Sequence, residues 1–214
     1  MGRDKGLLEF GGVPLVVHTV RLIEPLVACV TVVGASRAYA ATGLHPIADQ
    51  DVANHGSKKI RRGPLAGIAA ALAATQSSWN LILACDLPYL SAEWIEWLLS
   101  RAIRSRAQVV IPRTGRGLEP LAAVYRRECG SAIATALARG ERKVTDVIEE
   151  LRLDVFDESE WRRLDPCAQV LKNMNTPADY DEARKWWEVE RLGQCHPIKK
   201  TRLARKRKSQ PAIR

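Results

Sequence analysis

The sequence predicts an α/β protein in which helices cover both faces of a doubly wound, mostly parallel sheet, giving three layers. Short apolar runs rich in β-branched residues alternate along the chain with helix-like segments, and several of these runs end directly at Gly, Pro or Asp. The 214 residues, 46% of them apolar and 27% charged, are enough to bury a substantial core. That composition excludes collagen-like, low-complexity and wholly disordered chains.

The first half of the chain begins with a helix and continues through two apolar runs. Pro14 stands in the first turn of the predicted helix, where its missing N–H is harmless. The run 30–33 is β-branched and ends at Gly34, which is typical of a buried strand. The predicted elements are a helix over 13–26, a strand over 30–33, a short strand over 46–49, a polar loop over 50–62, a helix over 63–75 and a strand over 80–85.

The second half of the chain continues the same alternation. Ser91 is a good N-cap, and Glu93 suits the positive end of the helix that follows. The further predicted elements are that helix over 91–104, strands over 109–112 and 119–125, helices over 127–139 and 144–151, a strand over 153–156 and a helix over 177–192. We expect residues 1–192 to form one domain and residues 193–214 to form a basic, disordered tail.

The positive charge of the chain is concentrated at its carboxyl end. The net charge is +9, but eight of the 33 Lys and Arg residues lie in 199–214, where there is no acid. The rest of the chain is close to neutral, and the tail lacks aromatic residues that could stack on bases, so nucleic acid is disfavoured as a partner. An electrostatic contact of the tail with nucleic acid or an acidic protein is the alternative.

The cysteine count and the hydropathy pattern indicate where the protein is located. Five cysteines, an odd number without paired spacing, are typical of a reducing compartment rather than a disulfide framework. No apolar run reaches the roughly 18 residues that a membrane-spanning helix needs. We therefore expect a cytoplasmic protein that does not contact membranes.

Asp86 is the sharpest candidate for a functional side chain. It follows an apolar strand directly, so its carboxylate is expected at the carboxyl edge of the sheet, where open α/β folds bind ligands. A carboxylate in that place suits Mg²⁺, which binds through one or two carboxylates together with substrate phosphates. The alternative is that Asp86 only caps the turn before Pro88, and the spacing favours neither.

Four other segments could contribute to a site at that edge. Gly63-Pro64-Leu65-Ala66-Gly67 opens a helix, and its glycines and free N–H groups allow close approach to a ligand, although a tight turn explains them equally well. Asn175 precedes a helix and could bind a ligand or simply cap that helix. Asp49 ends a candidate strand, and Lys5 could contact a phosphate, although an exposed lysine is the ordinary case.

Taken together, these segments resemble the MobA family of molybdenum cofactor guanylyltransferases, within the nucleotidyltransferase superfamily. That family opens with a strand and the pattern L-x-G-G-x-S-x-R-M-G-x-D-K, followed by G-x-P-L, G-P-L-A-G, C-D-x-P and N-x-N-T-P. The matching segments here, in the same order, are Met1-Gly2-Arg3-Asp4-Lys5, Gly12-Val13-Pro14-Leu15, Gly63-Pro64-Leu65-Ala66-Gly67, Cys85-Asp86-Leu87-Pro88 and Asn173-Met174-Asn175-Thr176-Pro177. Each motif is weak alone, but five in order over about 190 residues are a specific signal.

The resemblance implies a Rossmann-like nucleotidyltransferase fold and the transfer of GMP from GTP to molybdopterin phosphate, with Mg²⁺ as cofactor and release of pyrophosphate. By carry-over, Lys5 would contact the triphosphate and Asp86 would hold Mg²⁺. Asp49 and Asn175 would help to bind nucleotide or metal, and the loop 63–67 would approach the guanine. The strand over 119–125 resembles the pterin side of the site, and maturation proteins of molybdenum enzymes are implied as candidate partners.

The match to the family begins in the middle of its first motif. The family's first strand and its G-G-x-S-x-R loop, which wraps the triphosphate, have no counterpart in this sequence. We therefore expect that the natural protein starts upstream and that Met1 is an internal methionine. Two alternatives to the guanylyltransferase remain: a related nucleotidyltransferase that uses CTP or a sugar phosphate, and an inactive remnant of the family that acts by binding.

Overall fold

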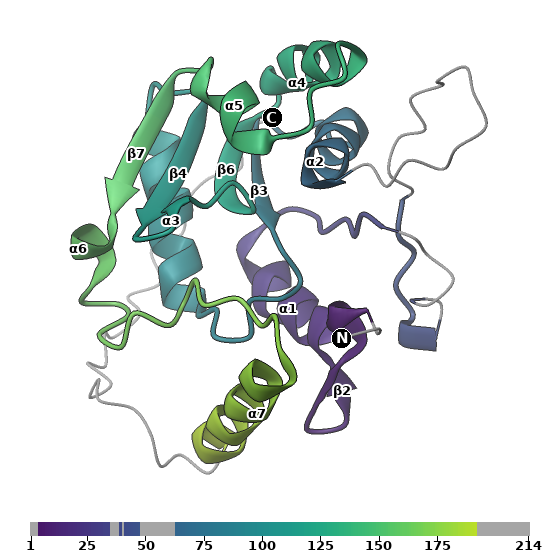
Figure 1. The fold of residues 1–214 in the computed structure, drawn as a ribbon, viewed down its shortest axis with the longest axis vertical. Coiled ribbons are helices and arrows are strands. Elements are labelled where there is room, and N and C mark those ends of the chain that lie inside the picture. The colour runs from purple at the N-terminus through teal and green to yellow at the C-terminus, as the bar shows by residue number, and fades with distance from the viewer. Residues whose placement is uncertain (1–3, 35–38, 40, 48–62, 192–214) are drawn as a thin grey trace, which may run out of the picture.

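A five-stranded sheet lies at the centre of the computed structural model, which describes residues 4–34, 39, 41–47 and 63–191 (Figure 1). The elements are η1 (Lys5–Leu7), β1 (Glu9–Phe10), β2 (Val13–Pro14), α1 (Leu15–Ile23), η2 (Glu24–Leu26), α2 (Gly63–Ala74), β3 (Trp79–Leu83), α3 (Ala92–Arg104), β4 (Val109–Thr114), β5 (Gly117–Leu118), β6 (Ala122–Arg126), α4 (Cys129–Ala138), α5 (Val144–Glu149), β7 (Leu153–Asp157), α6 (Glu158–Trp161) and α7 (Pro177–Arg191).

The strand pairing of this sheet is mixed. The order is β3-β6-β4-β5, and β7 also pairs with β4. β6 pairs antiparallel with both β3 and β4, β5 pairs antiparallel with β4, and β7 pairs parallel with β4. The expectation of mostly parallel pairing is therefore corrected: β3, β4 and β7 run one way, and β5 and β6 run the other. The cause is the short connection from β4 through β5 to β6, because closely connected neighbouring strands pair antiparallel.

Helices cover both faces of the sheet, which confirms the predicted three-layer α/β architecture. Ile111 and Tyr125 face one side and pack in a cluster with residues of α2, α4 and α5. Their neighbours Val110 and Val124 face the other side and pack with α3 and α6. This alternation follows from the two-residue period of a strand, and it explains why β4 and β6 read as continuous apolar runs rather than alternating ones.

A third cluster joins the two ends of the described chain. The ring of Phe10, in β1, meets Tyr180 of α7 edge-on at 5.4 Å between centroids. The Tyr180 hydroxyl donates to the carbonyl oxygen of Glu9 at 2.8 Å, and the indole N–H of Trp187 donates to the carbonyl oxygen of Pro88 at 2.9 Å. These contacts hold α7 against the first residues of the chain.

Most of the predicted elements are confirmed with small shifts in their ends. The predicted helix over 13–26 begins at Leu15, because Pro14 belongs to β2, and its last turn is the 3₁₀ helix η2. The Oγ of Ser91 accepts a hydrogen bond from the N–H of Trp94, which confirms its role as an N-cap. The strand pairs β1–β2 and β4–β5, both of them short, were not predicted.

The predicted buried strand over 30–33 is wrong in its burial. Its side chains are half-buried or exposed, and its regular pairing in the described residues is one parallel bridge between Val33 and Ile47. Residues 30–33 lack a strand on their other side in this part of the chain, and burial needs cover from both sides. Asp49, the predicted loop over 50–62 and the tail 193–214 lie outside the described residues.

In the described part of the chain, none of the helices combines the length and the apolar character needed to cross a lipid bilayer.

Candidate functional site at the end of strand β3

Three polar side chains predicted from separate motifs meet just beyond the end of β3. The Nζ of Lys5 donates to Asp86 Oδ2 at 2.9 Å and to Asn175 Oδ1 at 2.6 Å. These contacts span 81 and 170 residues of sequence. The structure therefore brings together Lys5, Asp86 and Asn175.

Lys5 is held in place by the turn that contains it. Asp4 caps the 3₁₀ turn η1, and its Oδ1 accepts hydrogen bonds from the backbone N–H of Gly6 at 3.0 Å and from the Tyr39 hydroxyl at 2.8 Å. A Cβ added at Gly6 would lie 2.8 Å from the Tyr39 oxygen and 3.4 Å from Cys85 Sγ. Only glycine therefore lets the turn lie this close to the end of β3.

Asn175 is placed by the backbone around the start of α7. The N–H of Met174 donates to the carbonyl oxygen of Asp86 at 2.9 Å, which ties the two segments together directly. Asp179 Oδ2 accepts from the N–H groups of Asn175 and Thr176, and the N–H of Asp179 donates to Thr176 Oγ1. This reciprocal cap fixes the turn, and its hydrogen bonds lower the pKa of Asp179. Thr176 is thus the helix cap, and the side chain of Asn175 is left to meet Lys5.

The segment Gly63–Gly67 forms the first turns of α2. Gly63 has φ of 61°, in the left-handed region that favours glycine, and a Cβ added at Gly67 would meet no atom within 4 Å. The side chains of Leu65 and Ala66 are buried in the core, so these two residues can reach a ligand only through their backbone. Gly63, Pro64 and Gly67 line the same cavity as Asp86, which places the start of this twelve-residue helix at the site.

The polar groups of the site are partly shielded from water. The side chains of Lys5 and Asp86 are 29% and 17% exposed, so their charges are screened less than those of a surface pair. Burial, followed by the nearby charges of Asp86 and Asp4, raises the pKa of Cys85 to about 11. Cys85 is therefore a neutral thiol at physiological pH and is not a nucleophile. Burial and the hydrogen bond to Asp4 likewise raise the pKa of Tyr39, which acts as a hydrogen-bond donor.

The donor set at Asp86 fits a magnesium ion only together with a bound phosphate. The described residues contain no group of three or more His, Cys, Asp or Glu side chains that could hold a metal. A single carboxylate with a neighbouring amide oxygen is a weak metal site by itself. Mg²⁺, however, keeps several waters and binds through one or two carboxylates plus substrate phosphates, and Asp86 can supply that share.

Glu119 lies in a separate polar cluster. Its Oε1 accepts from Thr114 Oγ1 at 2.8 Å and from Arg116, and the Arg116 guanidinium also donates to the carbonyl oxygen of Leu171. Thr114, Arg116 and Leu171 line a small pocket of about 210 Å³. The structure therefore gives Glu119 ordinary hydrogen-bonding partners, and a substrate role for the strand over 119–125 stays a prediction.

Sequence reasoning missed Asp4, Tyr39 and Asp179, which orient the residues that it found. The signal for Asp179 was present, since Thr176 and Asp179 have the spacing of a capping box. Tyr39 had no such signal, because nothing local to it indicates that it reaches Asp4, 35 residues earlier.

Comparison with known proteins identifies the family. Residues 1–155 match the MobA-like NTP transferase domain. A probable molybdenum cofactor guanylyltransferase of Pelotomaculum thermopropionicum is 30% identical over 194 residues, covering 90% of each chain. A molybdenum cofactor guanylyltransferase of Pseudomonas aeruginosa is 34% identical over 179 residues, covering 82% of this chain and 83% of its own.

Solved structures agree with this at the level of the fold. Molybdopterin-guanine dinucleotide biosynthesis protein A from Archaeoglobus fulgidus superposes with a TM-score of 0.71 at 23% identity, covering 87% of this chain and 92% of its own. A 2-C-methyl-D-erythritol 4-phosphate cytidylyltransferase from Thermus thermophilus has a TM-score of 0.62 at 17% identity, covering 87% and 94%. The motifs, the Rossmann-like fold and the sequence matches lead to one conclusion: this chain belongs to the family of MobA-like NTP transferase domains.

Proposed function

We propose that this protein transfers GMP from GTP to the terminal phosphate of molybdopterin and releases pyrophosphate. The observation that carries the proposal is the cluster of Lys5, Asp86 and Asn175 at the end of β3. It joins three motifs of the family, and relatives that match over most of their length are named molybdenum cofactor guanylyltransferase or probable molybdenum cofactor guanylyltransferase.

The reaction needs no general base from the protein. A phosphate monoester has a second pKa of about 6, so the acceptor phosphate is largely ionised at neutral pH. One of its oxygens attacks the α-phosphorus of GTP, and the bond from that phosphorus to the bridging oxygen of the β-phosphate breaks. Pyrophosphate leaves with the electron pair, so atoms and charge balance. What remains for the protein is alignment and charge stabilisation.

Lys5 and Asp86 would divide the electrostatic work. In the described structure the Lys5 ammonium is neutralised by Asp86. A triphosphate brought against Asp86 would be repelled by its carboxylate unless a cation lay between them, and this favours Mg²⁺ as cofactor. Bound there, Mg²⁺ would offset the negative charge that develops on the phosphates. Lys5 could then donate to a phosphate oxygen, while the Asn175 amide keeps its ammonium oriented.

The start of α2 is suited to the nucleotide. The N–H groups of its first turn and its positive helix end favour an acceptor or an anion, and the left-handed Gly63 leaves the backbone open to close approach. We assign Gly63, Pro64 and Gly67 to this contact, with Leu65 and Ala66 supporting it from the core. Asp49 stays a predicted contributor outside the described residues.

The four described cysteines are free thiols, which supports a reducing cytoplasm as the place of the reaction. Maturation proteins of molybdenum enzymes remain predicted partners.

The test is transfer of label from GTP labelled at the α-phosphate to molybdopterin in the presence of Mg²⁺. We expect Asp86→Asn to lower kcat/KM by a factor of roughly 100 to 1,000, since the metal loses its carboxylate. The matched control is Asp146→Asn, because Asp146 forms an exposed ion pair with Lys143 at 2.6 Å, far from any proposed role. That control should keep full activity.

Three results would contradict the proposal in different ways. Faster transfer from CTP than from GTP would make the protein a cytidylyltransferase. Transfer to a sugar phosphate in preference to molybdopterin would change the acceptor. Binding of GTP without any transfer would indicate a remnant that acts by binding.

A further inference from the structure

The turn that carries Asp86 is held at both of its ends by α7 and the residues just before it. The N–H of Met174 donates to the carbonyl oxygen of Asp86, and the indole N–H of Trp187 donates to the carbonyl oxygen of Pro88; both bonds are 2.9 Å long. Met174 precedes α7, whereas Trp187 lies in its second half. Because the two bonds come from well-separated points, together they fix the orientation of the turn as well as its position.

The same helix holds the segment that follows Lys5. The Tyr180 hydroxyl donates to the carbonyl oxygen of Glu9 at 2.8 Å. The fully buried ring of Phe10 lies 5.4 Å from the ring of Tyr180 and 5.5 Å from the ring of Trp187, measured between centroids. Tyr180 and Trp187 are about two helical turns apart, so they share one face of α7. That face therefore contacts the Lys5 segment and the Asp86 turn together.

Trp187 is the residue at which these two sets of contacts meet. Its N–H bonds to the Asp86 turn, while its ring packs on Phe10 and, at 4.3 Å between centroids, on His18 of α1. The Nε2 of His18 lies 2.8 Å from the carbonyl oxygen of Phe10. In Figure 1, α7 lies apart from the central sheet, on the side of α1 and β2. Trp187 thus joins the first described segment to the end of β3 from outside the sheet.

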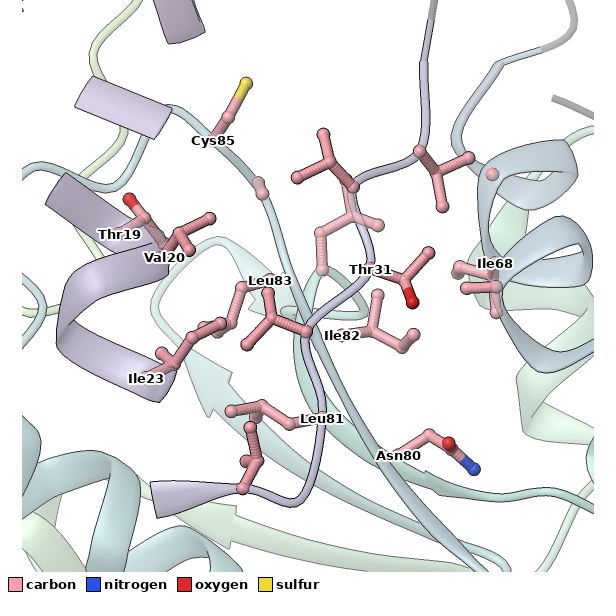
Figure 2. Close-up of a pocket in the computed structure, with 18 of the residues that line it drawn as sticks. Thr19, Val20, Ile23, Thr31, Ile68, Asn80, Leu81, Ile82, Leu83 and Cys85 are labelled. Atoms are coloured by element: carbon pink, nitrogen blue, oxygen red, sulfur yellow. The ribbon is translucent and has the colours of Figure 1, made fainter. Parts of the chain in front are cut away.

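The end of β3 has less support on its other side. A cavity of about 730 Å³ lies beside the strand, and its lining extends as far as Asp86. Figure 2 shows Leu81 and Leu83 of β3 at this cavity, with α1 on one side and Ile68 of α2 on the other. Every residue of β3 is only half-buried. The hydrogen bonds from the α7 segment therefore take a large part in placing Asp86.

The ion pair between Lys5 and Asp86 cannot keep the two segments together during the reaction. The Nζ of Lys5 lies 2.9 Å from Asp86 Oδ2. In the proposed function Lys5 donates to a phosphate oxygen and Asp86 faces Mg²⁺, so this direct contact is given up. The bonds from Trp187 and Tyr180 end on backbone carbonyl oxygens and use neither of these side chains. They can therefore persist when the ion pair is broken.

We propose that Trp187 is a positioning residue for the transfer reaction, which keeps the Asp86 turn and the Lys5 segment at a fixed separation once the ion pair has been replaced. It acts through its hydrogen bond to Pro88 and its packing on Phe10. Tyr180 completes the contact, and we call Tyr180 and Trp187 the α7 clamp. The inference rests on the proposed function of the site. It assigns to α7 a role in alignment, which the reaction needs because the attacking and leaving oxygens must lie in line.

The neighbouring tryptophan provides a matched control. Trp186 is half-buried like Trp187, and its ring packs edge-on against Tyr89 at 5.1 Å between centroids. Within the described residues its indole N–H makes no hydrogen bond, whereas that of Trp187 does. Substitution of either residue by Phe keeps an aromatic ring and removes the N–H. A difference between the two variants therefore measures the hydrogen bond to Pro88 rather than aromatic packing on α7.

The first experiment measures GMP transfer by Trp187→Phe and Trp186→Phe at saturating Mg²⁺. Loss of one alignment-setting hydrogen bond should lower the kcat of Trp187→Phe roughly 3- to 10-fold. KM for GTP should stay unchanged, because the clamp acts on the separation of the two segments and the ground-state nucleotide contacts remain. Trp186→Phe should keep both constants. Tyr180→Phe is the second variant, and it should change kcat in the same direction as Trp187→Phe.

The second experiment needs no substrate and imitates the loss of the ion pair by Lys5→Met. Hydrogen exchange is read at the amide of Met174, which bonds to Asp86, with the amide of Leu98 in α3 as a reference. With Lys5 present, Trp187→Phe should speed exchange at Met174 only about 3-fold, since the ion pair still ties the segments. In the Lys5→Met background the same substitution should speed it by more than about 10-fold. Trp186→Phe should have no effect in either background.

Three outcomes would overturn the proposal. Equal losses of kcat in Trp187→Phe and Trp186→Phe would mean that only the general packing of α7 matters. A lower Tm of Trp187→Phe with an unchanged kcat would make Trp187 purely structural. Equal acceleration of Met174 exchange with and without Lys5 would mean that the clamp does not take over from the ion pair. A wild-type protein that transfers no GMP would instead refute the proposed function, and the exchange comparison alone would then decide on the clamp.

Discussion

Strands β3 and β4 of the central sheet contain similar residues but differ in how completely they are packed. Val109, Val110 and Ile111 of β4 are fully buried, and β4 has neighbours on both edges. Leu81 and Ile82 of β3 are equally apolar, yet every residue of β3 is only half-buried, and within the described residues β3 pairs along one edge, with β6. Burial in this protein therefore depends on whether a neighbouring strand is in place, and residue type does not decide it.

The candidate site takes residues from both regions. Asp86 follows the half-buried strand β3, while α2, which approaches the same site, packs through Leu65 and Ile68 in one cluster with buried residues of β4 and β6. The position of α2 thus depends on the fully packed strands, and the position of Asp86 depends on the less completely packed β3. Variants that separate the two contributions test this difference.

The largest expected difference is between two isoleucines in the two strands that flank β6. Ile111→Ala in β4 removes a fully buried side chain and should lower the free energy of unfolding by roughly 3 to 4 kcal/mol. Ile82→Ala in β3 removes a half-buried side chain that lines the cavity between β3 and residues 27–34, and it should cost roughly 1 kcal/mol. Urea unfolding of both variants measures these values. Equal losses would show that β3 is packed as firmly as β4, and the contrast drawn here would be wrong.

A smaller effect is expected from Tyr39→Phe, which removes the hydrogen bond to Asp4 that orients the Lys5 turn. Loss of one such bond should lower kcat/KM for GTP roughly 3- to 10-fold. The matched control is Tyr125→Phe, because the hydroxyl of Tyr125, a buried residue of β6, donates to the carbonyl oxygen of Pro120. The control should lower Tm without changing kcat/KM. A positioning role for Tyr39 would be lost if both variants changed stability and kinetics in the same proportion.

The smallest effect concerns pH and the turn that holds Asn175. The pKa of Asp179 is lowered in the folded state, first by hydrogen bonds from the backbone N–H groups of Asn175 and Thr176. A carboxyl group of this kind stabilises the fold when ionised, and the contribution is lost as the pH falls through its folded pKa. The difference in Tm between the wild type and Asp179→Asn should therefore be constant near neutral pH and shrink below about pH 4. A difference that grows on acidification would contradict this assignment.

The sequence predicted well those features that depend on local pattern. The apolar runs of β3, β4 and β7 and the cap at Ser91 are read from neighbouring residues, and the structure has them. Asp86 was found because a carboxylate directly after an apolar run is conspicuous. The prediction for residues 30–33 went wrong because their composition is that of a buried strand, whereas their environment depends on a partner that no local pattern reveals.

Features that depend on distant contacts were less accessible. The meeting of Asp86 with Asn175 relies on the hydrogen bond from Met174 to the carbonyl oxygen of Asp86, and no spacing rule predicts that bond. The antiparallel placement of β6 depended on β5, whose two residues are too few to show a strand pattern. The family resemblance supplied what the local pattern could not, since the five motifs occur in an order that only a shared fold explains.

The long span between Lys5 and Asn175 also determines when the site can exist during synthesis. The two residues are separated by 170 positions. At typical rates of translation the ribosome needs roughly 10 to 30 seconds to add that length of chain. For that time a nascent molecule can contain Lys5 and Asp86 without the amide that orients them. On the proposed assignment of these three residues to the nucleotide, capture of GTP would then be confined to chains that are nearly finished, and incomplete products of translation would not compete for it.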